Sequence, residues 1–150
     1  MKTQIQIKEY VHKVLDTTRF AVLATESENK PHASFIAITA INDLFELVFA
    51  TYRNTRKYNN LKLNENVSIL FEYKSDKENI QQEITILTAF GKAKEVEIVD
   101  TDAIFNVHLL RHPQLKTFLL SSDCALFRVK VDDYQLVLGI DDVNWWNINS

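Results

Sequence analysis

Residues 44–73 read LFELVFATYRNTRKYNNLKLNENVSILFEY, and this stretch contains the pattern that decides the fold. The apolar runs 44–50 and 67–73 predict two strands, and the leucine and tyrosine spacing in 58–63 predicts a short helix between them. Thr55 stands just before this helix and is the predicted N-cap, because a hydroxyl there can accept hydrogen bonds from free backbone N–H groups. The stretch therefore predicts strand, loop, helix and strand, with the loop at 51–57.

The loop is basic at the point where the helix begins. A helix N-terminus carries partial positive charge and favours acidic residues, whereas this loop and first turn contain Arg53, Arg56 and Lys57. These cations become favourable if an anion lies among them, the free N–H groups and the hydroxyls of Thr51 and Thr55. Two interpretations stay open at this point: a phosphate site, or a solvated basic turn without a ligand.

Composition limits the class of protein. With 150 residues, of which 46% are apolar, residues 1–150 are expected to form a single domain with a substantial core. A net charge of -3 argues against nucleic acid or an anionic membrane as the main partner. The sequence contains only two glycines, Gly91 and Gly139, which excludes glycine-rich phosphate loops.

The lone cysteine and the start of the chain bear on location. Cys124 has no second cysteine with which to form an intramolecular disulfide or a cysteine zinc site. Residues 1–20 mix charged and apolar residues at helical spacing, which is typical neither of a secretory signal nor of a membrane span. We expect a cytoplasmic protein.

The rest of the chain predicts a mainly β fold. An amphipathic helix is expected over 7–17, a helix with Asp100 as N-cap over 103–110, and another turn or two over 115–120. Gly91 inside a predicted strand indicates a bulge or a bend, and residues 74–82 are a predicted loop. No strand–helix–strand unit repeats, so a small antiparallel barrel fits best. The predicted strands are 20–25, 32–41, 44–51, 67–73, 84–96, 124–131 and 134–138.

Several segments in order resemble one known family. FAVLAT (20–25), PHASFIAIT (31–39), LVFATYRNTRKYNNLKLNENVSILFEY (47–73) and GKAKEV (91–96) are similar to the pyridoxamine 5'-phosphate oxidase-like FMN-binding split barrels, with a weaker echo in residues 112–131. The most specific part is the hydroxyl and basic pattern at the strand–helix junction. The resemblance implies a six- to seven-stranded antiparallel split β-barrel with flanking helices, and it implies FMN as cofactor.

The resemblance also implies a set of cofactor-binding residues. In this family the junction binds the phosphate and ribityl region of FMN, and the end of the third strand lies near the flavin ring edge. Arg53 is expected as an accessory cation, and Ser34 as a contact on the second strand. The expected cofactor-binding residues are Thr51, Arg53, Thr55, Arg56, Lys57 and Ser34.

The chain departs from the named enzyme of the family. Ser34 and Thr39 fall near positions where that enzyme has an arginine and a lysine, so two charge-assisted contacts of roughly 1.5 to 3 kcal/mol each are absent. No counterpart of its basic and histidine-containing substrate segment is found near the C-terminus. The resemblance is therefore to the broad family, whose members form homodimers with flavin sites at the interface.

These observations predict an FMN-dependent oxidoreductase whose substrate and electron donor are not identified. FMN supplies the redox chemistry in such proteins. The alternative is a non-catalytic protein that binds or stores a flavin or haem on the same fold, and a deazaflavin is a third ligand to consider. Haem would require an axial ligand, for which His32, His108 and His112 are the candidates.

The remaining candidates have simpler explanations. His108 and His112 stand four residues apart on a predicted helix, but no carboxylate at suitable spacing completes a metal site. Cys124 has no neighbouring cation in the sequence and is expected to be buried and inert. Trp145 and Trp146 are expected to dock onto the body of the protein or onto a partner subunit.

Overall fold

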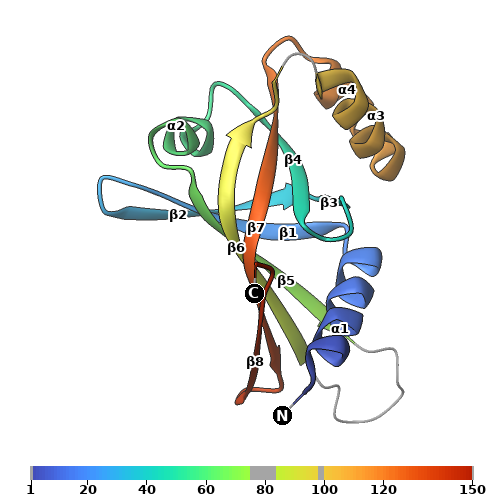
Figure 1. Cartoon of the computed structure of the whole chain (residues 1–150). Coiled ribbons are helices and arrows are strands. Elements are labelled where there is room, and N and C mark those ends of the chain that lie inside the picture. The colour runs from blue at the N-terminus through green and yellow to red at the C-terminus, as the bar shows by residue number, and fades with distance from the viewer. Residues whose placement is uncertain (1, 75–83, 98–99, 150) are drawn as a thin grey trace.

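The computed structural model describes residues 2–74, 84–97 and 100–149. These residues form a curled antiparallel sheet with helices around it (Figure 1). The elements are α1 (Gln4–Thr17), β1 (Phe20–Ser27), β2 (Lys30–Ala37), β3 (Thr39–Ile41), β4 (Glu46–Tyr52), α2 (Arg56–Leu63), β5 (Asn66–Lys74), β6 (Ile84–Glu95), α3 (Thr101–Arg111), the 3-10 helix η2 (Pro113–Leu115), α4 (Lys116–Leu120), β7 (Cys124–Leu138) and β8 (Asp142–Asn147).

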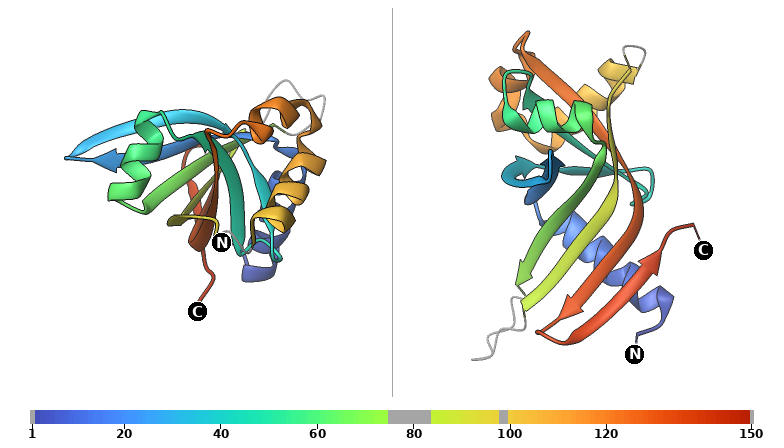
Figure 2. Two further views of the ribbon diagram at one scale, coloured as in Figure 1. Left: turned by 90° about the horizontal axis from the view of Figure 1, so that it is seen from above. Right: turned by 90° about the vertical axis from the view of Figure 1, so that its left-hand side faces the viewer.

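The sheet closes through one continuous segment. The strand order is β2-β1-β5-β6-β7-β4-β3, with β8 added beside β7. Residues 32–41, predicted as a single strand, bend at Ile38, whose N–H donates to the carbonyl of Arg19. The first half pairs with β1 and the second half with β4, so both edges of the sheet belong to this segment (Figure 2). The predicted split-barrel class is confirmed.

Two details of the strand prediction differ. The predicted strands 124–131 and 134–138 form one long strand, β7, because Asp133 pairs with Phe90 and Asp132 is accommodated as an extra residue between Val131 and Asp133 instead of forming a turn. The tail contains an eighth strand, β8, which was not predicted. The predicted loop 74–82 falls outside the described residues except for Lys74, which ends β5.

The predicted irregularity occurs at Gly91, but the extra residue of the bulge is Asp132 on β7, because Phe90 pairs with Asp133 and Gly91 pairs with Val131. The register between β6 and β7 shifts between Phe90 and Gly91. A Cβ atom on Gly91 would collide with the backbone carbonyl oxygen of Lys130 on β7. Glycine is therefore required there because the two strands approach closely, not because of an unusual φ angle.

The helices complete two apolar cores. The α1 helix begins with a capping box between Thr3 and Gln6 and packs its buried side chains into the main core inside the sheet. The α3 and α4 helices cover the outer side of β4 and β7 with a smaller cluster. The guanidinium of Arg111, at the end of α3, donates to the carbonyls of Leu15, Asp16 and Thr18.

None of the described helices combines the length and apolar character needed to cross a membrane.

Candidate functional site

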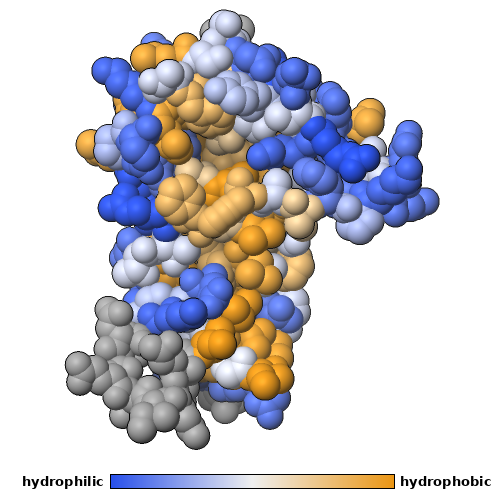
Figure 3. Space-filling view, turned by 180° about the vertical axis from the view of Figure 1, so that it is seen from behind, coloured by the Kyte–Doolittle hydropathy of each residue, from blue (hydrophilic) through white to orange (hydrophobic). Residues whose placement is uncertain are grey.

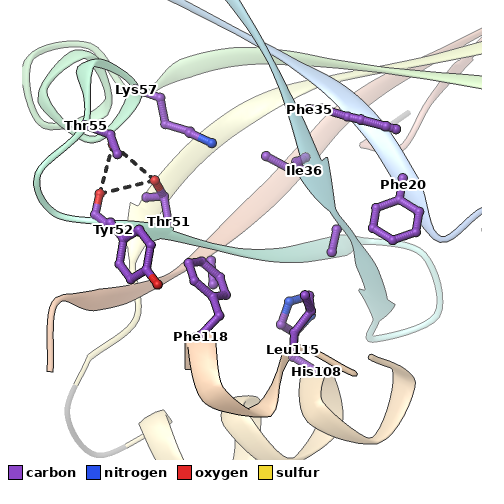
Figure 4. Close-up of a pocket in the computed structure, with 12 residues that line it drawn as sticks. Phe20, Phe35, Ile36, Thr51, Tyr52, Thr55, Lys57, His108, Leu115 and Phe118 are labelled. Atoms are coloured by element: carbon purple, nitrogen blue, oxygen red, sulfur yellow. Dashed lines mark hydrogen bonds between the residues drawn. The ribbon is translucent and has the colours of Figure 1, made fainter. Parts of the chain in front are cut away.

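A cavity of about 540 Å³ lies between the end of β4, the start of α2, the β1–β2 pair and the helices α3 to α4 (Figure 4). This volume lies within the range of about 300 to 1,000 Å³ that is common for small-molecule sites. The cavity is lined by Phe20, Phe35, Ile36, Ala37, Ala50, Thr51, Tyr52, Thr55, Lys57, His108, Leu115 and Phe118.

A network of hydroxyl groups forms one end of the cavity. Thr55 is the N-cap of α2, as predicted, and accepts from the N–H of Tyr58 at 3.1 Å. Its hydroxyl donates to the carbonyl of Tyr52 at 2.9 Å, and Thr51 Oγ1 lies 3.2 Å from Thr55 Oγ1. The hydroxyls thus bond mainly within the loop. They set its shape and leave the free N–H groups of the first helical turn as donors for a ligand.

Lys57 supplies the positive charge at this end. Its side chain points into the cavity from α2 (Figure 4). Within the part of the chain that the structure describes, Lys57 makes no ion pair and no side-chain hydrogen bond. Burial lowers the pKa of its ammonium group. A half-buried cation without a partner at a helix N-terminus is unfavourable alone and suits an anionic ligand.

The other predicted cations lie elsewhere. Arg53 donates to the carbonyls of Ser122 at 3.3 Å and Cys124 at 3.0 Å, and it lies 3.9 Å from Glu95. It therefore holds the start of β7 and does not line the cavity. Arg56 lines a separate hollow of about 300 Å³ together with residues of the β1–β2 hairpin.

Ser34 is also separate from this cavity. It pairs with Leu23 in the β1–β2 ladder, and its hydroxyl is buried with no hydrogen-bond partner among the described residues. Of the six expected contacts, the structure brings Thr51, Thr55 and Lys57 together at one end of the cavity.

The walls of the cavity are aromatic. Tyr52 and Phe118 meet edge to face with ring centroids 4.7 Å apart. Phe20 and Phe35 meet in the same manner at 5.6 Å. Phe35 is 64% exposed and Phe20 is 44% exposed, so this side is open to solvent. A slot of this kind suits a planar ring system, because ring faces and edges both give favourable aromatic contacts.

His108, one of the three candidate haem ligands, lines the cavity, although it was not among the expected cofactor-binding residues. It is 0% exposed, and its Nδ1 lies 2.8 Å from Oγ1 of Thr39 on β3. Its Nε2 has no hydrogen-bond partner among the described residues. Burial, and then the neighbouring His112, lowers the pKa of His108 to about 4. The spacing of the two histidines was visible in the sequence, but nothing there indicated that only one of them reaches the cavity.

His112 and the remaining candidates have structural roles. Because a carbonyl only accepts, His112 Nε2 donates its proton to the carbonyl of Ile38 at 2.8 Å. Within the described ranges no group of three or more potential metal ligands occurs. Burial raises the pKa of the Cys124 thiol despite the nearby Arg53, so the thiol is protonated at neutral pH.

The tryptophan pair docks onto the body of the protein, as expected. Trp146 stacks on Tyr134 with ring centroids 5.6 Å apart and packs against the main core. Trp145 stacks on Phe90 on the outer face of the sheet at 5.7 Å and stays 50% exposed.

Comparison with known families agrees with this architecture. A family model described as "Pyridoxamine 5'-phosphate oxidase" matches residues 7–137. The chain belongs to this family. The match runs from α1 to the end of β7 and so includes every element that lines the cavity. No match was found among the curated proteins.

Solved structures with the same fold include proteins named for different ligands. A heme binding protein from Mycobacterium smegmatis has a TM-score of 0.82 at 20% identity, covering 98% of this chain and 59% of that one. A FAD-binding protein from Mesorhizobium loti has a TM-score of 0.66 at 15% identity, covering 84% and 90%. General Stress Protein 26 from Bacillus anthracis has a TM-score of 0.70 at 20% identity, covering 95% and 99%. At these identities the likeness shows the fold alone.

Proposed function

We propose that this family member is a flavin-dependent oxidoreductase that binds FMN in the cavity between β4, α2 and α3. The observation that carries the proposal is Lys57, an unpaired and half-buried cation at the start of α2, at one end of an aromatic slot. A ligand that fits both features has an anionic end and a planar ring, and FMN has both.

The residues of the chain have separate roles in this proposal. Lys57 and the free N–H groups of the first turn of α2 hold the phosphate, and Thr51 and Thr55 keep the loop in the required shape. The aromatic walls around Tyr52 and Phe118 contact the ring. FMN supplies the hydride or electron transfer, while the protein supplies binding and orientation.

We place the protein in the cytoplasm, where a lone cysteine remains reduced.

A second copy of the chain is the proposed partner. Phe35, Val22 and Leu70 are neighbours across three strands and are 64%, 40% and 41% exposed. Figure 3 shows apolar side chains gathered over a broad area on one face of the molecule. Such areas mark interaction surfaces. Because Phe35 belongs both to this row and to the cavity wall, a second copy on this face also closes the open side of the cavity.

Haem is the second candidate ligand, and His108 is the observation that favours it. A histidine that binds haem iron through one nitrogen usually forms a hydrogen bond through the other, as His108 does with Thr39. His32 lies in the separate hollow beside Arg56, and His112 is not among the lining residues. His108 is therefore the axial candidate that this cavity offers.

The visible absorption spectrum tests the proposal directly. The purified protein is measured as isolated, then after FMN is added and the excess removed. We expect a bound flavin spectrum with one FMN per chain, and then reduction by NADH or NADPH with turnover when an electron acceptor is present. A protein that binds FMN without turnover would be a binder or store, a Soret band would favour haem, and failure to retain either ligand would contradict the proposal.

A further inference from the structure

His108 is a buried polar group in the otherwise apolar part of the cavity wall. It comes from α3, whereas Lys57 comes from α2, and the two lie on different sides of the cavity (Figure 4). The hydrogen bond to Thr39 occupies Nδ1 in either tautomer, because the threonine hydroxyl can donate or accept. Nε2 is left without a partner among the described residues in both cases.

An unpaired nitrogen of this kind requires an explanation. Leaving a buried polar group unsatisfied costs about 1 to 3 kcal/mol. His112, one turn later on the same helix end, also has one unpaired nitrogen, but its proton is donated to Ile38 and it is not among the residues that line the cavity. His108 differs because its ring lines a space large enough for a ligand. A ligand in this space is therefore the candidate partner for the buried Nε2.

We propose that Nε2 of His108 forms a hydrogen bond with the polar edge of the flavin ring, so that the cavity recognises the ring independently of the phosphate. This inference rests on the proposed function, since it assigns a contact to the flavin placed there. The low pKa of His108 keeps the imidazole neutral at physiological pH. The edge of a flavin ring offers uncharged carbonyl acceptors and an N–H donor, and a neutral imidazole can pair with either kind of group.

Two substitutions distinguish the role of Nδ1 of His108 from the role of Nε2. The amide of asparagine reaches about as far as Nδ1, so His108→Asn keeps a partner for Thr39 and removes the group at the position of Nε2. The amide of glutamine reaches about as far as Nε2, so His108→Gln restores a hydrogen-bonding group toward the ligand. His112→Asn is the matched control, because it changes the same residue type on the same helix end outside the cavity.

Each variant is titrated with FMN and with riboflavin, which has the ring but no phosphate, and binding is followed by the change in flavin fluorescence. For His108→Asn we expect the dissociation constants of both ligands to rise by a similar factor, about 2- to 12-fold, which is the loss of one neutral hydrogen bond. His108→Gln is expected to recover most of this loss, and His112→Asn to leave both constants near the wild-type values. Lys57→Ala is expected to weaken FMN far more than riboflavin.

Three results would overturn the inference. If His108→Asn, folded by circular dichroism, binds riboflavin as tightly as the wild type, Nε2 does not contact the ring. If this variant weakens FMN but not riboflavin, His108 acts on the phosphate end. If the wild type binds FMN in neither the fluorescence nor the absorption experiment, the proposed function fails, and the assignment of His108 fails with it.

Discussion

Thr51 and Thr55, four residues apart in the chain, have their hydroxyl oxygens 3.2 Å from each other. Thr51 is the buried next-to-last residue of β4, and Thr55 caps α2, so this contact joins the strand to the helix across the basic loop. The loop between them turns so that Lys57 faces the cavity while Arg56 faces a different hollow. The polar end of the site therefore depends on the cap of a short helix.

Removal of the Thr55 hydroxyl is expected to affect stability and binding together. Thr55→Ala removes the acceptor for the Tyr58 N–H, which should lower the free energy of unfolding by about 0.5 to 2 kcal/mol. FMN affinity should fall as well, because the first turn of α2 is less ordered. Urea denaturation and FMN titration measure the two effects, and Thr55→Ser should retain both properties. An alanine variant as stable as the wild type would show that the cap is unimportant.

The two adjacent cations should behave differently. Lys57→Ala should weaken FMN binding by roughly 10- to 150-fold, the loss of a charge-assisted hydrogen bond. Arg56→Ala is the matched control, since it removes the neighbouring cation from the same helix start but from another hollow. Equilibrium titration with FMN measures both. If Arg56→Ala has the larger effect, the phosphate lies on the other side of α2.

Acid should destabilise the protein through His108. Its pKa is lowered from 6.5 to about 4 in the folded state, so the unfolded chain binds the proton first as the pH falls. Stability is then full above about pH 6.5 and decreases by on the order of 3 kcal/mol as the pH falls to about 4. Denaturation at pH 7 and pH 4.5 measures this loss.

The control for this pH dependence is His108→Gln, which cannot titrate. The free energy of unfolding of this variant should fall much less between pH 7 and pH 4.5 than that of the wild type. Some decrease remains, because burial lowers the pKa of His112 as well. Arg111 and Arg19 lower the pKa of His112 further. Equal pH dependence in the variant and the wild type would contradict the assignment to His108.

The two glycines should tolerate substitution to different degrees. Gly91→Ala forces β6 and β7 apart at the Lys130 carbonyl and should lower the free energy of unfolding by about 1 to 3 kcal/mol. Gly139 has a φ of +68° in open space, so Gly139→Asn should have only a small effect. Thermal denaturation of the two variants compares them, and a Gly91→Ala protein as stable as Gly139→Asn would contradict the close approach.

The proposed dimer predicts a surface variant that separates the subunits. Phe35→Glu places a charge in the exposed apolar row on β2, β1 and β5 and should yield monomers in sedimentation velocity experiments. FMN affinity should fall in parallel, because Phe35 lines the cavity as well. Leu110→Glu is the control, since Leu110 is 85% exposed on α3 outside this row. If both variants sediment like the wild type, another surface forms the contact.

Short-range patterns in the sequence predicted a large part of the secondary structure. The N-cap at Thr55, the first helix, the irregularity at Gly91 and most strand positions were all predictable, because each depends on residues close together in the sequence. The split-barrel class and the family also followed from the ordered motifs around residues 47–73. Strand continuity was less predictable, since Asp132 and Asp133 look like turn residues, and β7 continues through them because Asp133 pairs with Phe90 on β6 and with Asn147 on β8.

The sequence by itself thus determined which segment carries the basic cluster and what fold surrounds it. Only the tertiary structure decided which members of that cluster can act together. Arg53 donates hydrogen bonds to backbone carbonyls at the start of β7, Arg56 lines a separate hollow, and Lys57 faces the aromatic slot. The same packing brings His108, on a helix 51 residues after Lys57, to the cavity. Side-chain direction and long-range contact depend on how the sheet curls, and no local pattern contains that information.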